Sequence, residues 1–466
     1  MTVPGGQPPD TVREAAGPGG DARGASGSRR PPLPPGPYLV VGLATSGAGA
    51  MRMLRPHGEV IGVDSASPEE AAELGASGFE VHVRTDGVEL LDRAATVVKS
   101  PGPARDTPVV AEALRRGVPV TGELELAWRL LPNDFVAVTG TNGKTTTVEL
   151  LGAMHRAAGA PAAVAGNVGT AVSQLIGLLQ PDATVICEAS SFQLADSDAF
   201  APEVAVILNL GVDHLDWHGT VAAYHDAKLR ALGNQASGDV AVVPAGLAAS
   251  RNLPGSADRV TFGAPGADVE ERDGHLLWRG RPLIDVEQIR LRGAHNRENA
   301  MAASVAALAR GLPPDAVVEA LRTFAGVPHR LEEVSVVRGV LYVNDSKATN
   351  VESASVGIRA FDGGVHAILG GSLKGGGFGG LRAAVAERCV ACHLIGEAAD
   401  ELARDLDGAA RLERDGDLPA AVHRAASDAR PGEVVLLSPA CASYDQYRNF
   451  EERGEHFRQL VAALGG

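Results

Sequence analysis

The stretch FVAVTGTNGKTTTVEL, residues 135–150, decides the class of fold. An apolar run ends at Thr139, a turn with two glycines follows, and Lys144 and Thr145 open a segment typical of a helix. In phosphate-binding loops, glycine N–H groups and a helix N-terminus contact phosphate oxygens, lysine adds a positive charge and a hydroxyl reaches Mg2+. Val138 replaces the first glycine of the usual spacing. The stretch therefore predicts an unusual branch of P-loop enzymes.

From Tyr38 onward, short apolar runs alternate with segments of helical periodicity, which is typical of parallel α/β architecture. The run from Tyr38 to Asp64 predicts a strand, a glycine turn, a helix and a second strand. That order resembles a Rossmann unit, in which an acidic residue after the second strand binds a ribose. Ala44 replaces the middle glycine of the pattern, so nucleotide binding and a purely structural turn are equally open at this point.

The 466 residues are enough for about three domains. We expect residues 1–36, which are rich in Pro, Gly, Ser and Arg, to be a disordered tail. The changes of pattern along the chain then predict domains over residues 37–131, 132–326 and 327–466.

The composition excludes several classes of protein. A net charge of -15 argues against a nucleic-acid binder. The chain has no apolar run typical of a signal peptide or a membrane span, so we expect a cytoplasmic location. Four cysteines are too few for a disulfide framework. Residues 389–393, CVACH, match a haem-attachment pattern, but they also predict a buried strand, and this second interpretation is favoured.

Lysine is scarce in this chain. Only five of the 42 basic residues are lysines, at positions 99, 144, 228, 347 and 374. A chain that prefers arginine so strongly is expected to keep lysine where a compact ammonium or a primary amine is needed. Chance placement is the alternative, so each lysine is judged by its surroundings.

Polar residues follow two apolar strands downstream of the P-loop. Glu188 ends one of them and His214 follows the next. In parallel sheets these ends meet at one edge, and carboxylate oxygens suit Mg2+. A zinc site with His214 and His218 is a weaker hypothesis, because no third ligand lies at suitable spacing. Lys228 falls on a predicted helix capped by Thr220, and Asn296 and Asn299 fall near the start of another.

Nine motifs occur together and in order: GTNGKTT, EASSFQL, NLGVDHLDWHG, YHDAKLRAL, LRGAHNRENAMAA, PHRLE, NDSKATN, LGGSLKGG and LSPACASYDQYRNFEERGEHF. In these motifs the chain resembles the Mur ligases from Tyr38 to the C-terminus. Within that family it is most similar to the members that add D-glutamate. The resemblance implies three α/β domains: an N-terminal Rossmann-like domain for UDP, a central P-loop ATPase-like domain and a C-terminal Rossmann-like domain for the amino acid.

The resemblance also implies roles for individual residues. Catalytic roles fall to Lys144, His214, Lys228 and Lys347. Two Mg2+ ions would be held by Thr145, Glu188, His214 and a carbamylated Lys228. ATP would be bound by Gly140, Thr141, Asn142, Gly143, Lys144, Thr145, Thr146, Asn299, Arg330 and Asp345. The two other substrates would be bound by Thr45, Ser46, Asp64, Ser65, Ser100, Gly102, Asn167, Ser190, Thr349, Lys374, Ser443 and Phe450.

The reaction implied is ATP-dependent ligation of D-glutamate to UDP-N-acetylmuramoyl-L-alanine through an acyl phosphate, by a monomer. Within the same fold, the alternatives are ligases that add L-alanine, a diamino acid or D-Ala-D-Ala, or that add glutamate to folate. The other muramyl ligases typically carry a DYAHxP-like sequence where this chain has NDSKATN. A nucleotide-binding regulatory protein without ligase activity is the alternative from a different class.

Overall fold

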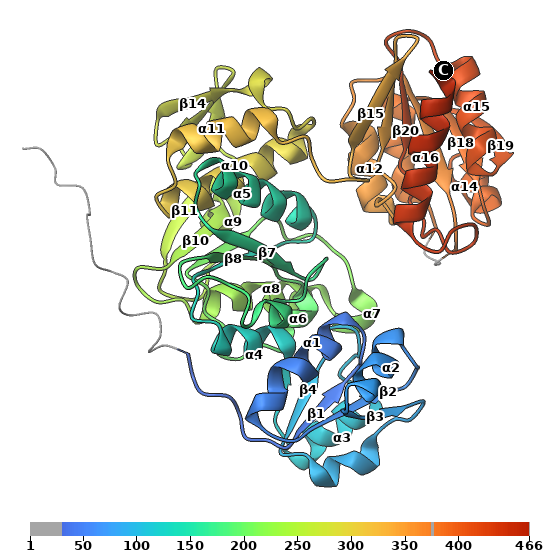
Figure 1. Ribbon diagram of the computed structural model, residues 1–466. Coiled ribbons are helices and arrows are strands. Elements are labelled where there is room, and N and C mark those ends of the chain that lie inside the picture. The colour runs from blue at the N-terminus through green and yellow to red at the C-terminus, as the bar shows by residue number, and fades with distance from the viewer. Residues whose placement is uncertain (1–29, 374–376, 466) are drawn as a thin grey trace, which may run out of the picture.

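The computed structural model describes residues 30–373 and 377–465, and within these ranges the chain forms three α/β units, each on its own sheet (Figure 1). Most neighbouring strands in every sheet are parallel, as the alternating apolar runs predicted. In the described part of the chain, no helix is long and apolar enough to cross a membrane.

The first unit has five parallel strands in the order β3-β2-β1-β4-β5. The strand order reverses between β1 and β4, and such a switch point is where open α/β sheets bind ligands. The strand, turn, helix and strand predicted for residues 38–64 are confirmed. The elements are β1 (Tyr38–Val41), α1 (Thr45–Leu54), β2 (Val60–Asp64), α2 (Glu69–Ala76), β3 (Glu80–Val83), β4 (Thr96–Lys99), α3 (Pro108–Arg116), β5 (Val120–Gly122) and α4 (Glu123–Leu130).

The central unit has nine strands in the order β14-β13-β12-β11-β10-β9-β6-β8-β7. The strand that leads into the P-loop, β6, lies between β8 and β9 and is buried along its whole length. The strands are β6 (Phe135–Thr139), β7 (Ala162–Gly166), β8 (Thr184–Glu188), β9 (Val204–Ile207), β10 (Val240–Pro244), β11 (Asp258–Phe262), β12 (Val269–Arg272), β13 (His275–Trp278) and β14 (Arg281–Asp285). The helices are α5 (Lys144–Ala157), α6 (Ser191–Ala195), α7 (Leu215–His218), α8 (Val221–Gly233), α9 (Ala245–Ser250), α10 (Ala294–Ala309) and α11 (Pro314–Thr323).

The C-terminal unit has six strands in the order β15-β16-β20-β17-β18-β19, of which only β15 is antiparallel to its neighbour. Four of its strands are largely buried apolar runs, as the alternating pattern predicted. Edge strands β15 and β19 were not predicted, because their residues are partly exposed and they lack an apolar run. The elements are β15 (Glu332–Val337), β16 (Val340–Asn344), α12 (Val351–Arg359), β17 (Val365–Gly370), α13 (Arg382–Arg388), β18 (Cys389–Ile395), α14 (Ala399–Asp405), β19 (Arg411–Gly416), α15 (Leu418–Asp428), β20 (Val434–Leu437) and α16 (Phe450–Leu464). CVACH begins β18, with Cys392 and His393 fully buried, as the strand interpretation predicted.

The first and central units share a hydrophobic core. One cluster of buried side chains includes Met51 of α1 and Trp128 of α4 together with Phe135 of β6 and Val185 of β8. The C-terminal unit has two clusters of its own. The first two units are therefore packed as one body, whereas the third is attached without a common core.

The end of the predicted tail differs from our expectation. Residues 30–36 run along the junction of the first two units, and the Arg30 guanidinium donates to the carbonyls of Trp128 and Asn133 at 3.0 and 2.7 Å. The same group lies 5.1 Å from the Trp128 ring and 5.4 Å from the Phe135 ring. These residues are held because the guanidinium stacks on aromatic rings and satisfies two carbonyls. Residues 1–29 lie outside the described range.

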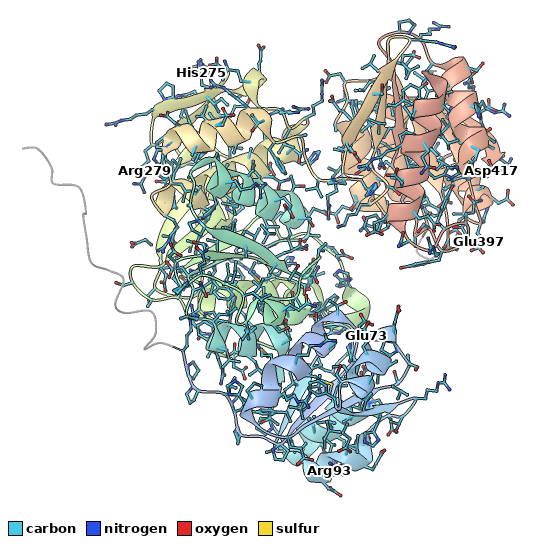
Figure 2. All side chains as sticks on the ribbon, in the orientation of Figure 1. Glu73, Arg93, His275, Arg279, Glu397 and Asp417 are labelled. Atoms are coloured by element: carbon cyan, nitrogen blue, oxygen red, sulfur yellow. The ribbon has the colours of Figure 1, made fainter. Side chains whose placement is uncertain are left out.

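Charged side chains lie on the outside of all three units. Figure 2 labels Glu73 and Arg93 on the first unit, His275 and Arg279 on the central unit, and Glu397 and Asp417 on the C-terminal unit. Arg93 makes ion pairs with Glu59 at 2.8 Å and with Glu80 at 2.6 Å. Such exposed pairs contribute little to stability, so the apolar cores hold each sheet.

Candidate functional site

The P-loop is shaped by its neighbours at the ends of β6 and β9. Gly143 has a φ of +88°, and a Cβ at this position would lie 2.2 Å from Oδ1 of Asn299, so only glycine fits. Asn209, which follows β9, accepts from the backbone N of Asn142 at 3.0 Å and donates to its carbonyl at 3.1 Å. The conformation of the loop is therefore fixed by contacts within the protein.

Two lysines share one carbonyl of this loop. Lys144 Nζ donates to the carbonyls of Gly140 and Thr141 at 2.8 and 3.0 Å, and Lys228 Nζ donates to that of Gly140 at 2.9 Å. Burial lowers the pKa of Lys144. Burial, and then the charge of Lys144, lower the pKa of Lys228 to about 6, against an opposing effect of Asp213. Lys228 is therefore a neutral amine near pH 7, the form that carbamylation requires.

A buried carboxylate lies beside the loop. Glu188 ends β8, and its Oε1 accepts from Nδ2 of Asn167 at 3.2 Å. Its Oε2 is buried and, among the described residues, has no hydrogen-bond partner. A buried charged oxygen without a partner is costly, so this atom fits a cation ligand. Thr145, predicted as a second ligand, has its hydroxyl beside Arg330, whose Nη2 donates to it at 3.1 Å.

His214 stands at the edge of the site. It caps α7 with a φ of +51°, its ring lies 4.7 Å from that of Phe192, and its Nε2 lies 3.5 Å from Oδ2 of Asp213. In the ranges that the structure covers, no three His, Cys, Asp or Glu side chains are grouped as a metal site. The predicted ligand set is not of this type. Only Glu188 and His214 belong to these residue types, and the other two ligands are the Thr145 hydroxyl and a carbamylated Lys228.

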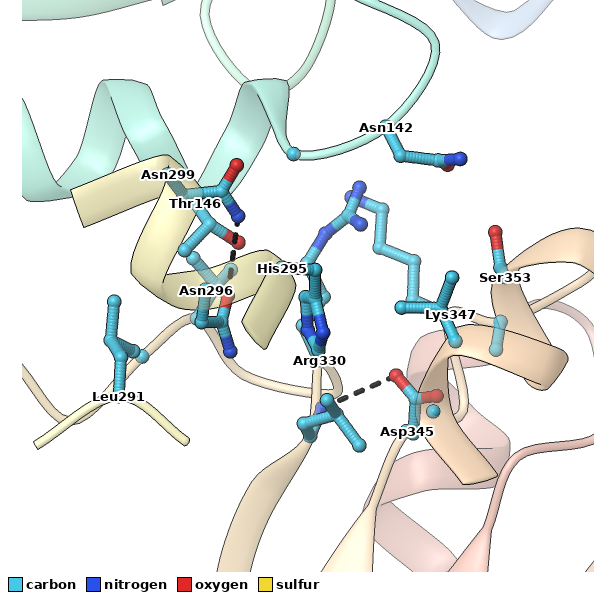
Figure 3. A pocket seen from close by; sticks show the side chains of 17 residues that line it. Asn142, Thr146, Leu291, His295, Asn296, Asn299, Arg330, Asp345, Lys347 and Ser353 are labelled. Atoms are coloured by element: carbon cyan, nitrogen blue, oxygen red, sulfur yellow. Dashed lines mark hydrogen bonds between the residues drawn. The ribbon is translucent and has the colours of Figure 1, made fainter. Parts of the chain in front are cut away.

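A pocket lies between the P-loop and the C-terminal unit (Figure 3). It brings together seven residues predicted from the sequence: Asn142, Gly143, Thr146, Asn299, Arg330, Asp345 and Lys347. Its volume is about 70 Å³, well below the roughly 300–1,000 Å³ of typical ligand pockets. Arg330 extends toward the P-loop in this arrangement, so a nucleotide would have to displace it from Thr145.

The titrating groups of this pocket are perturbed by burial. Burial raises the pKa of Asp345 to about 7, although Ser438 Oγ donates to its Oδ2 at 2.7 Å and the Leu331 backbone N donates to its Oδ1 at 3.2 Å. Burial, and then the charge of Arg330, lower the pKa of Lys347 to about 8. Both side chains thus change charge close to neutral pH.

A second cavity, of about 830 Å³, lies at the ends of the first sheet's strands. Seven of the residues predicted for substrate binding line this cavity. Those residues are Thr45, Ser46, Asp64, Ser65, Ser100, Gly102 and Asn167. The Asp64 carboxylate accepts from the backbone N of Leu43 and Ala66, both at 2.7 Å, and so holds the glycine turn against β2. Asn167 is the only one of the seven that comes from the central unit.

Residues predicted for the amino-acid substrate gather at the strand ends of the C-terminal sheet. Lys347 Nζ lies 5.1 Å from the ring centroid of Phe450, and the hydroxyl of Ser346 donates to the Phe450 carbonyl at 2.8 Å. Ser443 is buried in the loop after β20, and Thr349 follows Lys347 in the loop before α12. Lys374 lies outside the described residues.

Ser190 has a structural role that the sequence did not reveal. It is the N-cap of α6, its hydroxyl accepts from the Gln193 backbone N at 3.2 Å, and its own backbone N donates to the Gln193 side chain at 3.0 Å. The hydroxyl is therefore engaged in a reciprocal cap, although a role in substrate binding stays open as a prediction.

Several lining residues were missed. Arg84, Thr85 and Asp86 follow β3 and line the large cavity, and His295 and Ser353 line the small pocket. The strand-end rule would have identified the first three, but β3 has only four residues, none of them fully buried, and it was not recognised as a strand. His295 and Ser353 carry no local signal.

Comparison with known proteins identifies the family of this chain. A family model described as the Mur ligase middle domain matches residues 138–307, and one described as the Mur ligase, glutamate ligase domain matches residues 329–441. A protein of Acidobacterium capsulatum named UDP-N-acetylmuramoylalanine--D-glutamate ligase is 40% identical, over 92% of this chain and 96% of its own length. The chain belongs to the Mur ligase family. A protein of the same name from Anaeromyxobacter dehalogenans is 44% identical to this Mur ligase, over 91% of the chain and 96% of its own length.

Solved structures show the same fold. This Mur ligase matches UDP-N-acetylmuramate-alanine ligase of Thermotoga maritima with a TM-score of 0.59 at 18% identity, over 91% of this chain and 99% of that chain. It matches the MurF ligase of the same organism, solved in complex with ADP, with a TM-score of 0.57 at 18% identity, over 81% of this chain and 92% of that chain. The three-unit fold of this Mur ligase is thus shared with both.

Proposed function

We propose that this Mur ligase joins D-glutamate to UDP-N-acetylmuramoyl-L-alanine with ATP, giving UDP-N-acetylmuramoyl-L-alanyl-D-glutamate, ADP and phosphate. The position of Asn167 is the observation on which the proposal chiefly rests. It lines the large cavity and donates to Glu188, whose second oxygen is buried and unpartnered among the described residues. A substrate held in the cavity would thus end beside the P-loop. Relatives at 37–44% identity bear the corresponding ligase name.

Each unit would hold one substrate. Residues 37–131 would bind the UDP part of the precursor, residues 132–326 would bind ATP, and residues 327–466 would bind D-glutamate. The large cavity in the first unit and the pocket beside the P-loop support this division. We also propose that the protein works as a monomer in the cytoplasm.

Two Mg2+ ions would be held by Thr145, Glu188, His214 and carbamylated Lys228. Two observations support this ligand set: one oxygen of Glu188 has no hydrogen-bond partner among the described residues, and Lys228 has a low pKa. A carbamate turns the amine into an oxygen ligand with negative charge, which hard cations prefer. When bound, Mg2+ neutralises phosphate charge during the transfer.

The chain's residues would act by positioning and by charge. Lys144 and Arg330 would lie beside the phosphates, and both are partly buried cations with which a polyphosphate would pair. The substrate's alanyl carboxylate would attack the γ-phosphorus, and the bond from that phosphorus to ADP would break. The D-glutamate amine would then attack the acyl phosphate at its carbonyl carbon, lose a proton and expel phosphate.

Lys347, Thr349, Lys374, Ser443 and Phe450 would receive D-glutamate. The nearness of Lys347 to Phe450 supports this assignment for two of them. An ammonium close to the incoming dicarboxylate would pair with one carboxylate and leave the amine free to react.

Phosphate release from ATP tests the proposal. The assay contains the purified chain, Mg2+ and UDP-N-acetylmuramoyl-L-alanine, and compares D-glutamate with L-glutamate, D-alanine and diaminopimelate. We expect release with D-glutamate together with a new amide. Release with another amino acid would favour a different ligase of the family, and nucleotide binding without any release would favour a regulatory protein.

A further inference from the structure

Lys99 is the one lysine of the five that the proposed reaction does not use. It ends β4 and its side chain is fully buried. Its Nζ donates to the carbonyls of Ser100 at 3.1 Å and Pro103 at 2.6 Å, and lies 2.8 Å from Oδ2 of Asp196. The two carbonyls accept hydrogen bonds from the ammonium, and the Asp196 carboxylate forms a close ion pair with it.

The two carbonyls belong to a turn, residues 100–103, that forms a wall of the large cavity. Ser100 is held a second time, because its hydroxyl donates to the carbonyl of Gly42 at 2.6 Å. Gly42 begins the glycine turn, which lines the same cavity. Lys99 thus holds one wall of the cavity from behind, without lining it.

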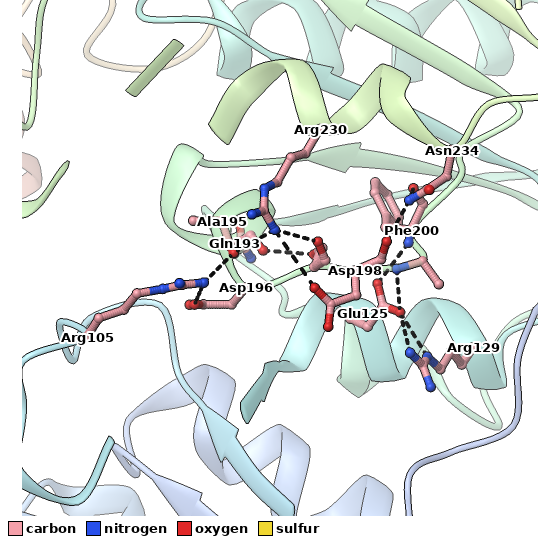
Figure 4. A network of polar contacts seen from close by, with 12 residues as sticks. Arg105, Glu125, Arg129, Gln193, Ala195, Asp196, Asp198, Phe200, Arg230 and Asn234 are labelled. Atoms are coloured by element: carbon pink, nitrogen blue, oxygen red, sulfur yellow. Dashed lines mark hydrogen bonds and ion pairs between the residues drawn. The ribbon is translucent and has the colours of Figure 1, made fainter. Parts of the chain in front are cut away.

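Asp196 belongs to the central unit. It caps the C-terminus of α6, a helix that begins three residues after Glu188. Its carbonyl accepts from Gly122 N at 2.9 Å, and Arg105 contacts the same corner through the Ala195 carbonyl at 2.8 Å (Figure 4). Through Asp196, the first unit is therefore bound to the helix that follows the strand carrying Glu188.

Lys99 also reaches the segment that carries His214. Its Nζ lies 5.3 Å from the ring centroid of Trp217 in α7. Burial lowers the pKa of Lys99, while the charge of Asp196 raises it. An ammonium donates in three directions from one compact atom, whereas a guanidinium is wider and its donors lie in one plane. This geometry explains why a chain so rich in arginine has lysine here.

We propose that Lys99 is a positioning residue, which holds the turn of residues 100–103 at a fixed place relative to α6 and so aligns a substrate in the large cavity with Glu188. The inference rests on the proposed function, since that function assigns the cavity to the UDP-linked substrate. Lys99 touches no reacting atom. Its effect would appear in substrate affinity rather than in the binding of ATP.

The test compares the full-length chain with Lys99→Met. Calorimetry measures affinity for UDP-N-acetylmuramoyl-L-alanine and, separately, for a non-hydrolysable ATP analogue with Mg2+. We expect the variant to bind the UDP-linked substrate about tenfold more weakly or worse, because the turn loses its anchor. KM for that substrate should rise in parallel, and affinity for the ATP analogue should be unchanged. Unchanged affinity for the UDP-linked substrate would overturn the proposal.

Two further variants separate positioning from stability. In Lys99→Met the buried Asp196 carboxylate loses its closer cation and keeps the 3.5 Å contact with Arg105, so Lys99→Met/Asp196→Asn removes a weakly paired charge and should regain thermal stability. We expect its affinity for the UDP-linked substrate to stay low, and full recovery of both properties would overturn the proposal. Arg105→Met is the matched control, because Arg105 contacts the same corner but not the turn; it should bind substrate normally.

The outcomes also distinguish this inference from the proposed function. Calorimetry needs no turnover, so it decides the role of Lys99 even if the unsubstituted chain releases no phosphate. Absence of phosphate release would count against the ligase proposal. Absence of any binding of the UDP-linked substrate by the unsubstituted chain would overturn both.

Discussion

At the scale of single residues, the central observation is that Lys228 is a buried amine beside a second lysine. Its pKa of about 6 follows from burial and then from Lys144, so the unprotonated amine predominates above pH 6. Reaction with carbon dioxide needs that unprotonated amine and would yield the proposed metal ligand. Carbamylation is accordingly expected at neutral pH and should decrease as the pH falls below about 6.

Lys228→Ala should lose activity about a hundredfold or more, since even partners of metal ligands contribute 10–100-fold. Acetate should restore much of it by supplying the missing carboxylate in the space left by the side chain. The measurement is phosphate release with and without acetate. Thr220→Ala is the matched control on the same helix, because it removes only the α8 cap and should show no response to acetate. Full activity of Lys228→Ala in the absence of acetate would disprove the carbamate.

The pKa of Lys347 predicts how the affinity for the amino acid varies with pH. Its pKa of about 8 means that the ammonium is charged below pH 8 and becomes neutral as the pH rises through that value. KM for D-glutamate should therefore increase from pH 7.5 to 9.5, since an attraction to a carboxylate is lost. In Lys347→Arg the charge persists, so the pH dependence of KM should vanish even if KM itself is higher. A flat profile in the unsubstituted chain would contradict this role.

At the scale of elements, helix α16 joins the loops of the C-terminal site through one buried arginine. Arg453 donates to the Ser346 carbonyl at 2.9 Å and hydroxyl at 3.0 Å, and to the carbonyls of Cys441 at 3.1 Å and Ala442 at 3.3 Å. These acceptors belong to the loops after β16 and β20, which carry Lys347 and Ser443. The helix therefore determines how the two loops face each other.

Arg453→Met should lower the free energy of unfolding by about 3 kcal/mol or more, because several buried acceptors lose a charged donor at about 1–3 kcal/mol each. Urea denaturation followed by circular dichroism measures the change. Arg458→Met is the matched control on the same helix, since Arg458 is one-third exposed and pairs with Glu332 and Glu455. It should change stability by less than about 1 kcal/mol. An equal loss of stability in the two variants would refute the greater structural role of Arg453.

At the scale of the whole molecule, the three units are joined unequally. The first and central units share one core and the buried Lys99–Asp196 pair, so they are expected to stay together. The C-terminal unit has separate cores and meets the P-loop through contacts such as Arg330 to Thr145. Under the proposed function, Lys347 would approach a carboxylate delivered from the first unit. The C-terminal unit would then be the part that moves.

Energy transfer between fluorescent labels should detect this movement. Cysteines introduced at the exposed positions Glu73, Arg279 and Glu397, one in each unit (Figure 2), provide two label pairs. With an ATP analogue, Mg2+ and the UDP-linked substrate, we expect the Glu73–Glu397 pair to shorten as the site closes and excludes water. The Glu73–Arg279 pair should not change. A change in both pairs, or in neither, would contradict a single moving unit.

Much of the fold was predictable because its signals are local. The apolar strands before Gly140, Asp64 and Glu188 are long enough to be recognised, and the glycine turns and helix caps that follow them depend on near neighbours. Polar edge strands such as β15 and β19 were missed, because half-exposed strands lack an apolar run. Residues 30–36 were assigned to the tail from composition, whereas Arg30 is held by distant aromatic rings.

In the candidate site, too, some features follow from local sequence and others only from tertiary packing. The identities of Lys144, Glu188 and Lys228 follow from motifs in the chain, because each motif is a continuous run of residues. The low pKa of Lys228, the unpartnered oxygen of Glu188 and the burial of Lys99 against Asp196 arise only when segments distant in sequence pack together. Burial and charge proximity are properties of that packing, and no local stretch encodes them.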